Sequence, residues 1–127
     1  MFKNIIITCV LGALAIAFGA FGAHALKNIL TPQELISFET AVRYQMYHVI
    51  VLLFVNTYAG FNLSQKNRLS YIYFLGIFLF SGSIYAIYLT PISPKDIWFI
   101  TPIGGLTLIL GWIFMIVIFL KKSTNNK

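Results

Sequence analysis

A cation, an amide and an imidazole lie within six residues of this chain, at Arg43, Gln45 and His48, where a long hydrophobic run begins. A guanidinium binds phosphate or another anion through its planar fork of donors. An imidazole titrates near neutral pH and can therefore accept or pass on a proton. A charged side chain at the centre of a bilayer costs at least about 2.5 to 3.5 kcal/mol on insertion scales. Polar groups in such a run therefore indicate a binding site, a pathway or a bond between helices.

Polar residues in three other hydrophobic runs fall at the same depth as this group. The first run ends on a histidine, the third carries two serines and the fourth opens on a threonine, whereas the opposite half of the runs offers only Asn56, Thr57 and isolated hydroxyls. Because four separate segments deliver hydrogen-bonding groups to one level, we expect either a ligand site or a polar network that holds the helices in register. The members of this predicted outer polar layer are His24, Arg43, Gln45, His48, Ser81, Ser83 and Thr101.

Two members of the layer also have purely structural interpretations. Glu39 precedes Arg43 by four residues, the favourable order for an ion pair on one helix face, and such a pair would let the arginine lie at the membrane edge. His48 could equally form a hydrogen bond to a neighbouring helix or take part in a proton-linked step.

Catalysis is the use that these residues support least. His24, His48 and Glu39 could ligate a metal or act as acid and base, but their spacing is not that of a metal site, and no nucleophile is paired with a base. We therefore expect no catalytic residue, no metal and no cofactor, and we do not expect an enzyme.

Composition predicts the elements that must position these residues. The chain of 127 residues is 59% hydrophobic and only 9% charged, whereas soluble domains are about a quarter charged. Four stretches lack any charged residue, and each exceeds the roughly 20 residues that a helix needs to cross a bilayer. They are Asn4 to Leu26, Tyr44 to Gln65, Leu69 to Pro94 and Ile97 to Leu120. The sequence predicts an all-α, integral membrane four-helix bundle.

Local signals predict a single membrane domain over residues 1–127. Thr31, Pro32 and Glu34 form a helix start, with Thr31 as N-cap and Glu34 reaching back to it. Pro102 should kink the fourth helix or divide it into a short interfacial piece and a span. The predicted helices cover residues 4–26, 32–61, 69–90 and 94–120, and a polar tail covers residues 121–127.

The distribution of charge predicts the orientation. If all four helices span, one side carries six cations and no Asp or Glu, and these cations are Lys3, Lys66, Arg68, Lys121, Lys122 and Lys127. The other side carries Lys27, Arg43 and Lys95 against Glu34, Glu39 and Asp96. The positive-inside rule places the first side, with both termini, in the cytoplasm. The net charge of +6 is spread over helix ends without a nucleic-acid motif, so nucleic acid is not an expected partner.

Small residues recur on the predicted helices at helical spacing. Helices in lipid associate by close van der Waals approach, which small residues permit. We expect packing contacts at Gly12, Gly19, Gly22, Gly76, Gly104 and Gly111.

Four segments together resemble the YgdD/YwdK-like family of small bacterial inner-membrane proteins. They cover residues 19–26 (GAFGAHAL), 38–48 (FETAVRYQMYH), 79–85 (LFSGSIY) and 100–105 (ITPIGG) with Gly111 and Trp112. The resemblance covers nearly the whole chain, in order. It implies a four-span, multi-pass protein of the bacterial plasma membrane and supplies no established activity, because the family is a domain of unknown function.

Two hypotheses about function follow. The first is a non-enzymatic structural or accessory protein that acts through helix–helix, self or lipid interaction, with the bilayer, a second copy or another membrane protein as partner. The second is transport of a proton, an ion or a small solute through an oligomer, by way of the outer polar layer. The absence of an intramembrane carboxylate and of internal repeats counts against the second.

Overall fold

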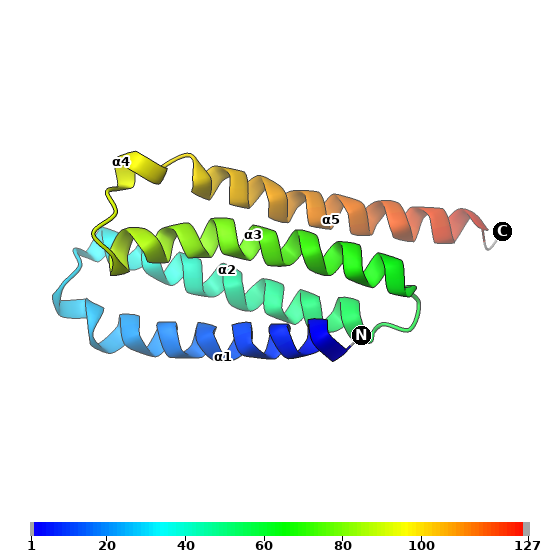
Figure 1. Cartoon of the computed structure of the whole chain (residues 1–127), viewed down its shortest axis with the longest axis horizontal. Coiled ribbons are helices and arrows are strands. Elements are labelled where there is room, and N and C mark those ends of the chain that lie inside the picture. Colours follow the sequence, from blue (N-terminus) through cyan, green and yellow to red (C-terminus); the bar gives the residue numbers. More distant parts are fainter. Residues whose placement is uncertain (1, 126–127) are drawn as a thin grey trace.

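The computed structural model describes residues 2–125, and these residues form helices and short connections (Figure 1). Four helices are long: α1 (Phe2–His24), α2 (Pro32–Thr57), α3 (Leu63–Leu89) and α5 (Ile100–Asn125). Two elements are short: the 3-10 helix η1 (Leu26–Asn28), after α1, and α4 (Pro94–Ile97), between α3 and α5. Successive long helices run in opposite directions, so α1 begins and α5 ends at the same end of the bundle.

Capping boxes explain where the two central helices begin. The Thr31 hydroxyl accepts from the Glu34 amide, and the Thr31 amide donates to the Glu34 carboxylate at 2.8 Å, which lowers the pKa of Glu34. Asn62 and Gln65 form the same reciprocal pair at the start of α3. The predicted start of this helix at residue 69 is therefore wrong, because the Asn62 box adds six residues at its N-terminus.

The fourth predicted helix is divided, and the break falls before its proline. Ser93 is the N-cap of α4, and its hydroxyl accepts a hydrogen bond from the Lys95 amide. The chain leaves the helix at Trp98 and re-enters it at Ile100. Pro102 then lies in the first turn of α5, where its missing amide hydrogen has no intrahelical acceptor to lose. At the other end α5 extends through Asn125, so it includes most of the predicted polar tail over residues 121–127, whose last two residues lie outside the described ones.

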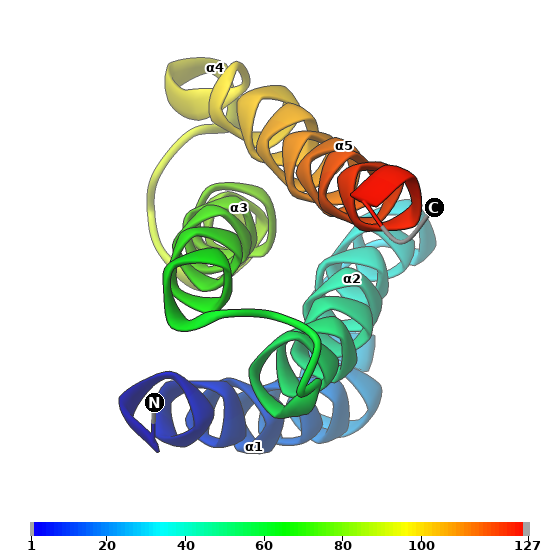
Figure 2. The same ribbon diagram turned by 90° about the vertical axis from the view of Figure 1, so that its right-hand side faces the viewer.

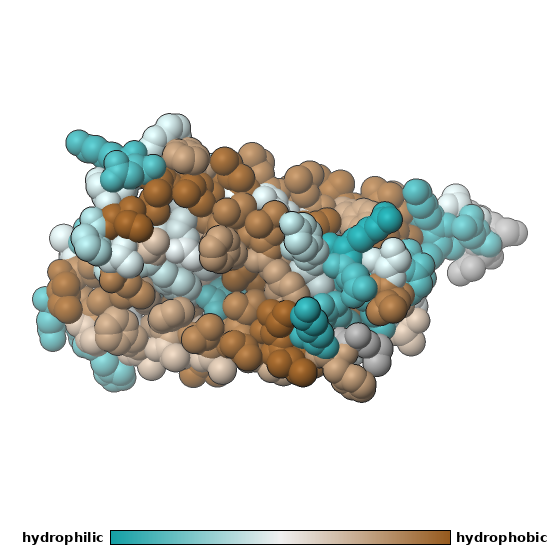
Figure 3. Space-filling model, in the orientation of Figure 1, coloured by the Kyte–Doolittle hydropathy of each residue, from teal (hydrophilic) through white to brown (hydrophobic). Residues whose placement is uncertain are grey.

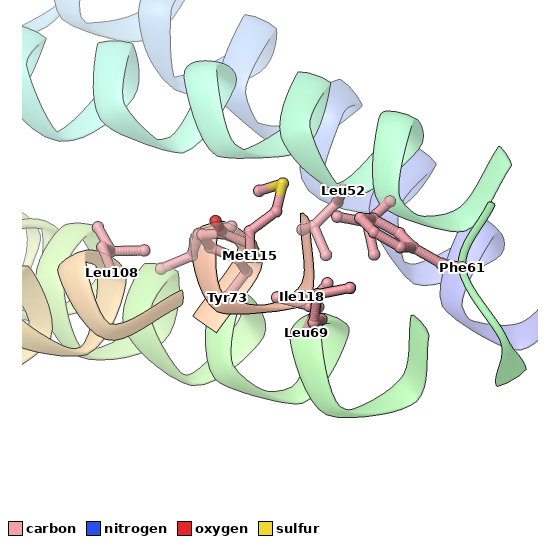
Figure 4. Close-up of a cluster of buried hydrophobic side chains, with 9 residues drawn as sticks. Leu52, Phe61, Leu69, Tyr73, Leu108, Met115 and Ile118 are labelled. Atoms are coloured by element: carbon pink, nitrogen blue, oxygen red, sulfur yellow. The ribbon is translucent and has the colours of Figure 1, made fainter. Parts of the chain in front are cut away.

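The helices pack in a chain of neighbours rather than around a common axis. α3 packs most extensively on α5 and then on α2, and α1 packs on α2. Viewed along the bundle, α2 and α3 lie in the middle, with α1 and α5 on opposite sides (Figure 2). The main hydrophobic core therefore lies between α2, α3 and α5 and contains Leu52, Val55, Phe61, Leu69, Tyr73, Ile77, Leu108, Met115 and Ile118 (Figure 4).

The surface has the pattern of a membrane protein. Three stretches are long and apolar enough to cross a membrane: Phe2–Asn28, Leu63–Leu89 and Pro94–Asn125. The fourth long helix, α2, carries more polar residues, and its 26 residues extend about 39 Å, enough to cross the roughly 30 Å hydrocarbon core. Brown apolar side chains cover the middle of the visible face, and teal polar side chains gather toward its two ends (Figure 3). The chain is an all-α, four-helix membrane protein.

Candidate functional site

Gln45 joins three helices from the middle of α2. Its amide nitrogen donates to the Leu11 carbonyl of α1 at 2.7 Å, and its amide oxygen accepts from the Tyr85 hydroxyl of α3 at 2.7 Å. The side chain is buried, with 2% of its surface exposed. Both ends of the amide are therefore used inside the bundle.

His48 lies one turn further along α2 and is held at both ring nitrogens. Nδ1 lies 2.7 Å from the Tyr44 carbonyl, and Nε2 lies 3.3 Å from the indole nitrogen of Trp112 on α5. A carbonyl oxygen can only accept and an indole N–H can only donate, so Nδ1 carries the proton and Nε2 accepts. The contacts fix a neutral imidazole in one tautomer that links α2 to α5.

The predicted serines and threonine of the layer also form hydrogen bonds between helices. The buried Ser81 hydroxyl donates to the Ala41 carbonyl of α2 at 2.7 Å. The Ser83 hydroxyl donates to the Phe80 carbonyl of its own helix at 2.9 Å. It also lies 2.6 Å from the Thr101 hydroxyl of α5, within hydrogen-bond distance. These bonds connect α3 to both of its neighbours.

Space next to the layer is lined mainly by apolar side chains. Gln45, Ser81 and Tyr85 lie at the wall of a groove of about 180 Å³ between α1 and α3. The rest of its lining is Leu11, Leu14, Phe18, Phe74, Ile77, Phe78 and Gly82. An acyl chain fits such a lining better than water, since a buried water requires two to four polar partners.

Two predicted members of the layer, His24 and Arg43, are not part of this network. His24 is exposed at the end of α1, on the helix face opposite the one that packs against α2. Arg43 is also exposed and lies with Glu39 at a hollow of about 260 Å³ on the surface between α1 and α2. The sequence predicts a shared depth for these residues, but the rotation of each helix decides which side chains face inward, and the structure does not bring His24 or Arg43 into contact with Gln45 and His48.

The six predicted packing glycines lie at helix contacts, but the space for an added methyl group differs widely among them. A methyl group at Gly12 or Gly19 would meet a valine of α2 at 3.3 or 3.4 Å, and one at Gly22 would meet Phe38 at 2.9 Å. A methyl group at Gly104 would overlap the backbone of α3, where it would lie 2.6 Å from the Leu79 carbonyl carbon and the Phe80 Cα and closer still to the Phe80 nitrogen. Gly76 and Gly111 face Leu108 and Tyr73 across the same α3–α5 interface. This interface therefore depends most strictly on the absence of side chains.

A second polar cluster at the opposite end of the bundle was not predicted. The Asn4 amide of α1 donates to the amide oxygens of Asn56 at 3.3 Å and Asn67 at 3.0 Å. The Asn56 amide donates to the Ser70 hydroxyl at 2.9 Å, and the Lys66 ammonium donates to the Asn56 carbonyl at 3.0 Å. We call these five residues the amide cluster. The expectation that this half offers only isolated polar groups is wrong, because the late predicted start of α3 left two of them in a loop.

Metal ligands do not gather in the part of the chain that the structure describes. Within residues 2–125, no three His, Cys, Asp or Glu side chains lie close enough together to hold an ion.

Comparison with known proteins identifies relatives over most of the chain. Residues 18–105 match the family described as protein of unknown function (DUF423). The UPF0382 membrane protein SAB0533 of Staphylococcus aureus (strain bovine RF122) is 42% identical over 85% of this chain and 90% of its own length. The UPF0382 membrane protein YwdK of Bacillus subtilis (strain 168) is 38% identical over 92% and 95%. A UPF0382 membrane protein of Haemophilus influenzae (strain Rd) is 36% identical over 87% and 88%. No solved structure matches the chain.

Proposed function

Because the chain belongs to the DUF423 family of proteins of unknown function and its relatives are membrane proteins, we propose that it is a non-enzymatic structural or accessory protein of the bacterial plasma membrane. One observation carries this proposal: the members of the outer polar layer that lie inside the bundle bind backbone carbonyls and other side chains of the chain. Gln45, His48 and Ser81 each have a partner within the chain at 3.3 Å or less. Groups engaged in this way stabilise a shape rather than bind a substrate.

The orientation we propose has both termini in the cytoplasm. The end of the bundle where α1 begins and α5 ends carries Lys3, Lys66, Arg68, Lys121 and Lys122. The chain's three carboxylate side chains, Glu34, Glu39 and Asp96, belong to the other end. This asymmetry supports the orientation through the positive-inside rule.

The partner surface that we propose is the outer face of α1. This helix packs mainly on α2, with a few side-chain contacts to α3, and the opposite face carries exposed small residues at Ala13, Ala17 and Ala20. Close approach over such residues is how helices associate in lipid. We propose that a second copy of the chain, or another membrane protein, packs there.

Cys9 allows a direct test, because it is the chain's single cysteine and is exposed on this same face. Oxidation with copper phenanthroline in native membranes is expected to yield a disulfide-linked dimer. Ala17→Leu should reduce the yield several-fold by adding bulk to the face, whereas Ile16→Leu, at an exposed position that is already large, should leave it unchanged. A chain that stays monomeric in native lipid, with no crosslink, would rule out self-association.

Transport is the competing hypothesis, and it has a different structural requirement. A pathway through the outer polar layer needs Gln45 and His48 to exchange their protein partners for water or a substrate during each cycle. The bonds from Gln45 to two helices and from His48 to Trp112 oppose such an exchange.

A further inference from the structure

The end of the bundle that carries the amide cluster also has a basic hollow between the start of α3 and the last turns of α5. The hollow has a volume of about 550 Å³. Three cations line it, Arg68 from α3 and Lys121 and Lys122 from α5. Its other lining residues are Gly60, Asn62, Ser64, Gln65, Phe114, Val117, Ile118 and Asn125. No Asp or Glu occurs among these described lining residues, so nothing acidic in the lining neutralises the three cations.

The three cations are held differently. The Lys122 ammonium donates to the Gly60 carbonyl and lies 6.0 Å from the centre of the Phe61 ring, so it is anchored to the α2–α3 connection. Arg68 and Lys121 are exposed, one on each side of the hollow. An anchored cation with two exposed ones around a concave surface is an arrangement suited to an anion, and the guanidinium fork of Arg68 matches the geometry of phosphate.

An apolar groove continues from the hollow toward the middle of the bundle. It has a volume of about 590 Å³, and Arg68 and Phe114 belong to both spaces. The remaining lining is Asn67, next to Arg68, and Tyr71 and Ile72, which lie one turn further along α3. A small soluble anion would fill only the hollow. A molecule with a phosphate at one end and a hydrocarbon chain at the other would fill both.

We propose that the hollow and groove together bind an anionic phospholipid, with its phosphate at Arg68 and Lys121 and an acyl chain along Tyr71, Ile72 and Phe114. Basic pockets between membrane helices bind anionic headgroups in the same way, because their cations lie at the level of the lipid phosphates. The inference deepens the lipid part of the proposed function by giving it a site, and it does not depend on whether α1 self-associates.

Native mass spectrometry of the detergent-purified full chain tests the site. Titration with phosphatidylglycerol and with phosphatidylcholine of the same acyl chains should show preferential retention of the anionic lipid, and the preference should weaken as salt rises. Removing one cation by Arg68→Gln or Lys121→Gln should weaken phosphatidylglycerol binding by about fivefold. Lys3→Gln is the matched control, because it removes an exposed cation from the same end of the molecule but outside the hollow.

Further measurements distinguish lipid binding from binding of a soluble anion and from a loss of folding in the variants. Glycerol phosphate, which lacks acyl chains, should not displace bound phosphatidylglycerol at millimolar concentration. Equal binding of the two lipids, or full displacement by glycerol phosphate, would overturn the proposal. Helicity by circular dichroism should match among the variants, since the substituted side chains are exposed. The salt dependence of lipid binding by the unmodified chain tests the electrostatic contribution without any variant. Failure of the Cys9 crosslink would leave these results unchanged, so the two proposals fail separately.

Discussion

At the scale of single residues, the contribution of a buried polar atom to stability depends on whether it has a hydrogen-bond partner. Residue types predict that Gln45, His48, Ser81, Ser83 and Thr101 carry the polar chemistry of the helices, and the structure places all five at helix contacts. The sequence could not predict the partners, because half of them are backbone carbonyls, such as those of Leu11 and Ala41, that any residue would offer. Nor could it predict Trp112 as the donor to His48, since that pairing depends on the rotation of α5.

Two tyrosines of α3 give a matched test of this property. The Tyr85 hydroxyl donates to Gln45 at 2.7 Å, whereas the Tyr73 hydroxyl is buried and has no hydrogen-bond partner among the described residues. Tyr85→Phe should lower the free energy of unfolding by about 1 kcal/mol, because it leaves the Gln45 oxygen unpaired. Tyr73→Phe should leave it unchanged or raise it by up to about 1 kcal/mol, because an unpaired buried hydroxyl is removed. Titration of mixed micelles with a denaturing detergent measures both, and equal losses would contradict this account.

At the scale of elements, capping and helix contacts decide the architecture. The Thr31 box is predictable from the sequence because Pro32 and Glu34 accompany it, whereas the Asn62 box lies outside the predicted helices because Lys66 and Arg68 precede the charge-free run that begins at Leu69. Predicted small-residue stripes identify glycines at the α1–α2 and α3–α5 contacts but cannot rank them, since the ranking depends on which backbone or side chain lies opposite.

Neighbouring glycines at the start of α5 test that ranking. A methyl group at Gly104 would overlap backbone atoms of Leu79 and Phe80 in α3, where neither side can yield without separating the helices. A methyl group at Gly105 would make an ordinary contact with the Phe80 ring at 3.7 Å. Gly104→Ala should therefore lower the free energy of unfolding by about 2 kcal/mol or more, within the usual range for overpacking, and Gly105→Ala should change it by less than about 0.5 kcal/mol. The same detergent titration measures the difference, and a tolerated Gly104→Ala would contradict the backbone-to-backbone contact.

At the scale of the whole molecule, the bundle is open rather than closed around an axis. Hydrophobic runs and charge positions predict four helices and common placement of the termini, because both depend only on distance along the chain. They do not predict that α1 and α5 lie on opposite sides, since that order depends on contacts between distant residues. The open order leaves the outer face of α1 and the basic hollow of α5 on separate surfaces, which suits a protein that holds a helix partner on one side and lipid on the other.

The central claim is that the members of the outer polar layer inside this bundle, such as Gln45 and His48, have their hydrogen-bond partners within the chain and stay dry. Magnetisation transfer from water to side-chain nitrogens, measured by solid-state NMR on the chain in lipid bilayers, tests it most directly. The account predicts that the Gln45 amide and the His48 ring receive water magnetisation no faster than the backbone amide of the buried Leu52, while the ammonium of the exposed Lys95 receives it quickly. Fast transfer to both Gln45 and His48 would reveal a water-filled path through the outer polar layer and would contradict the account.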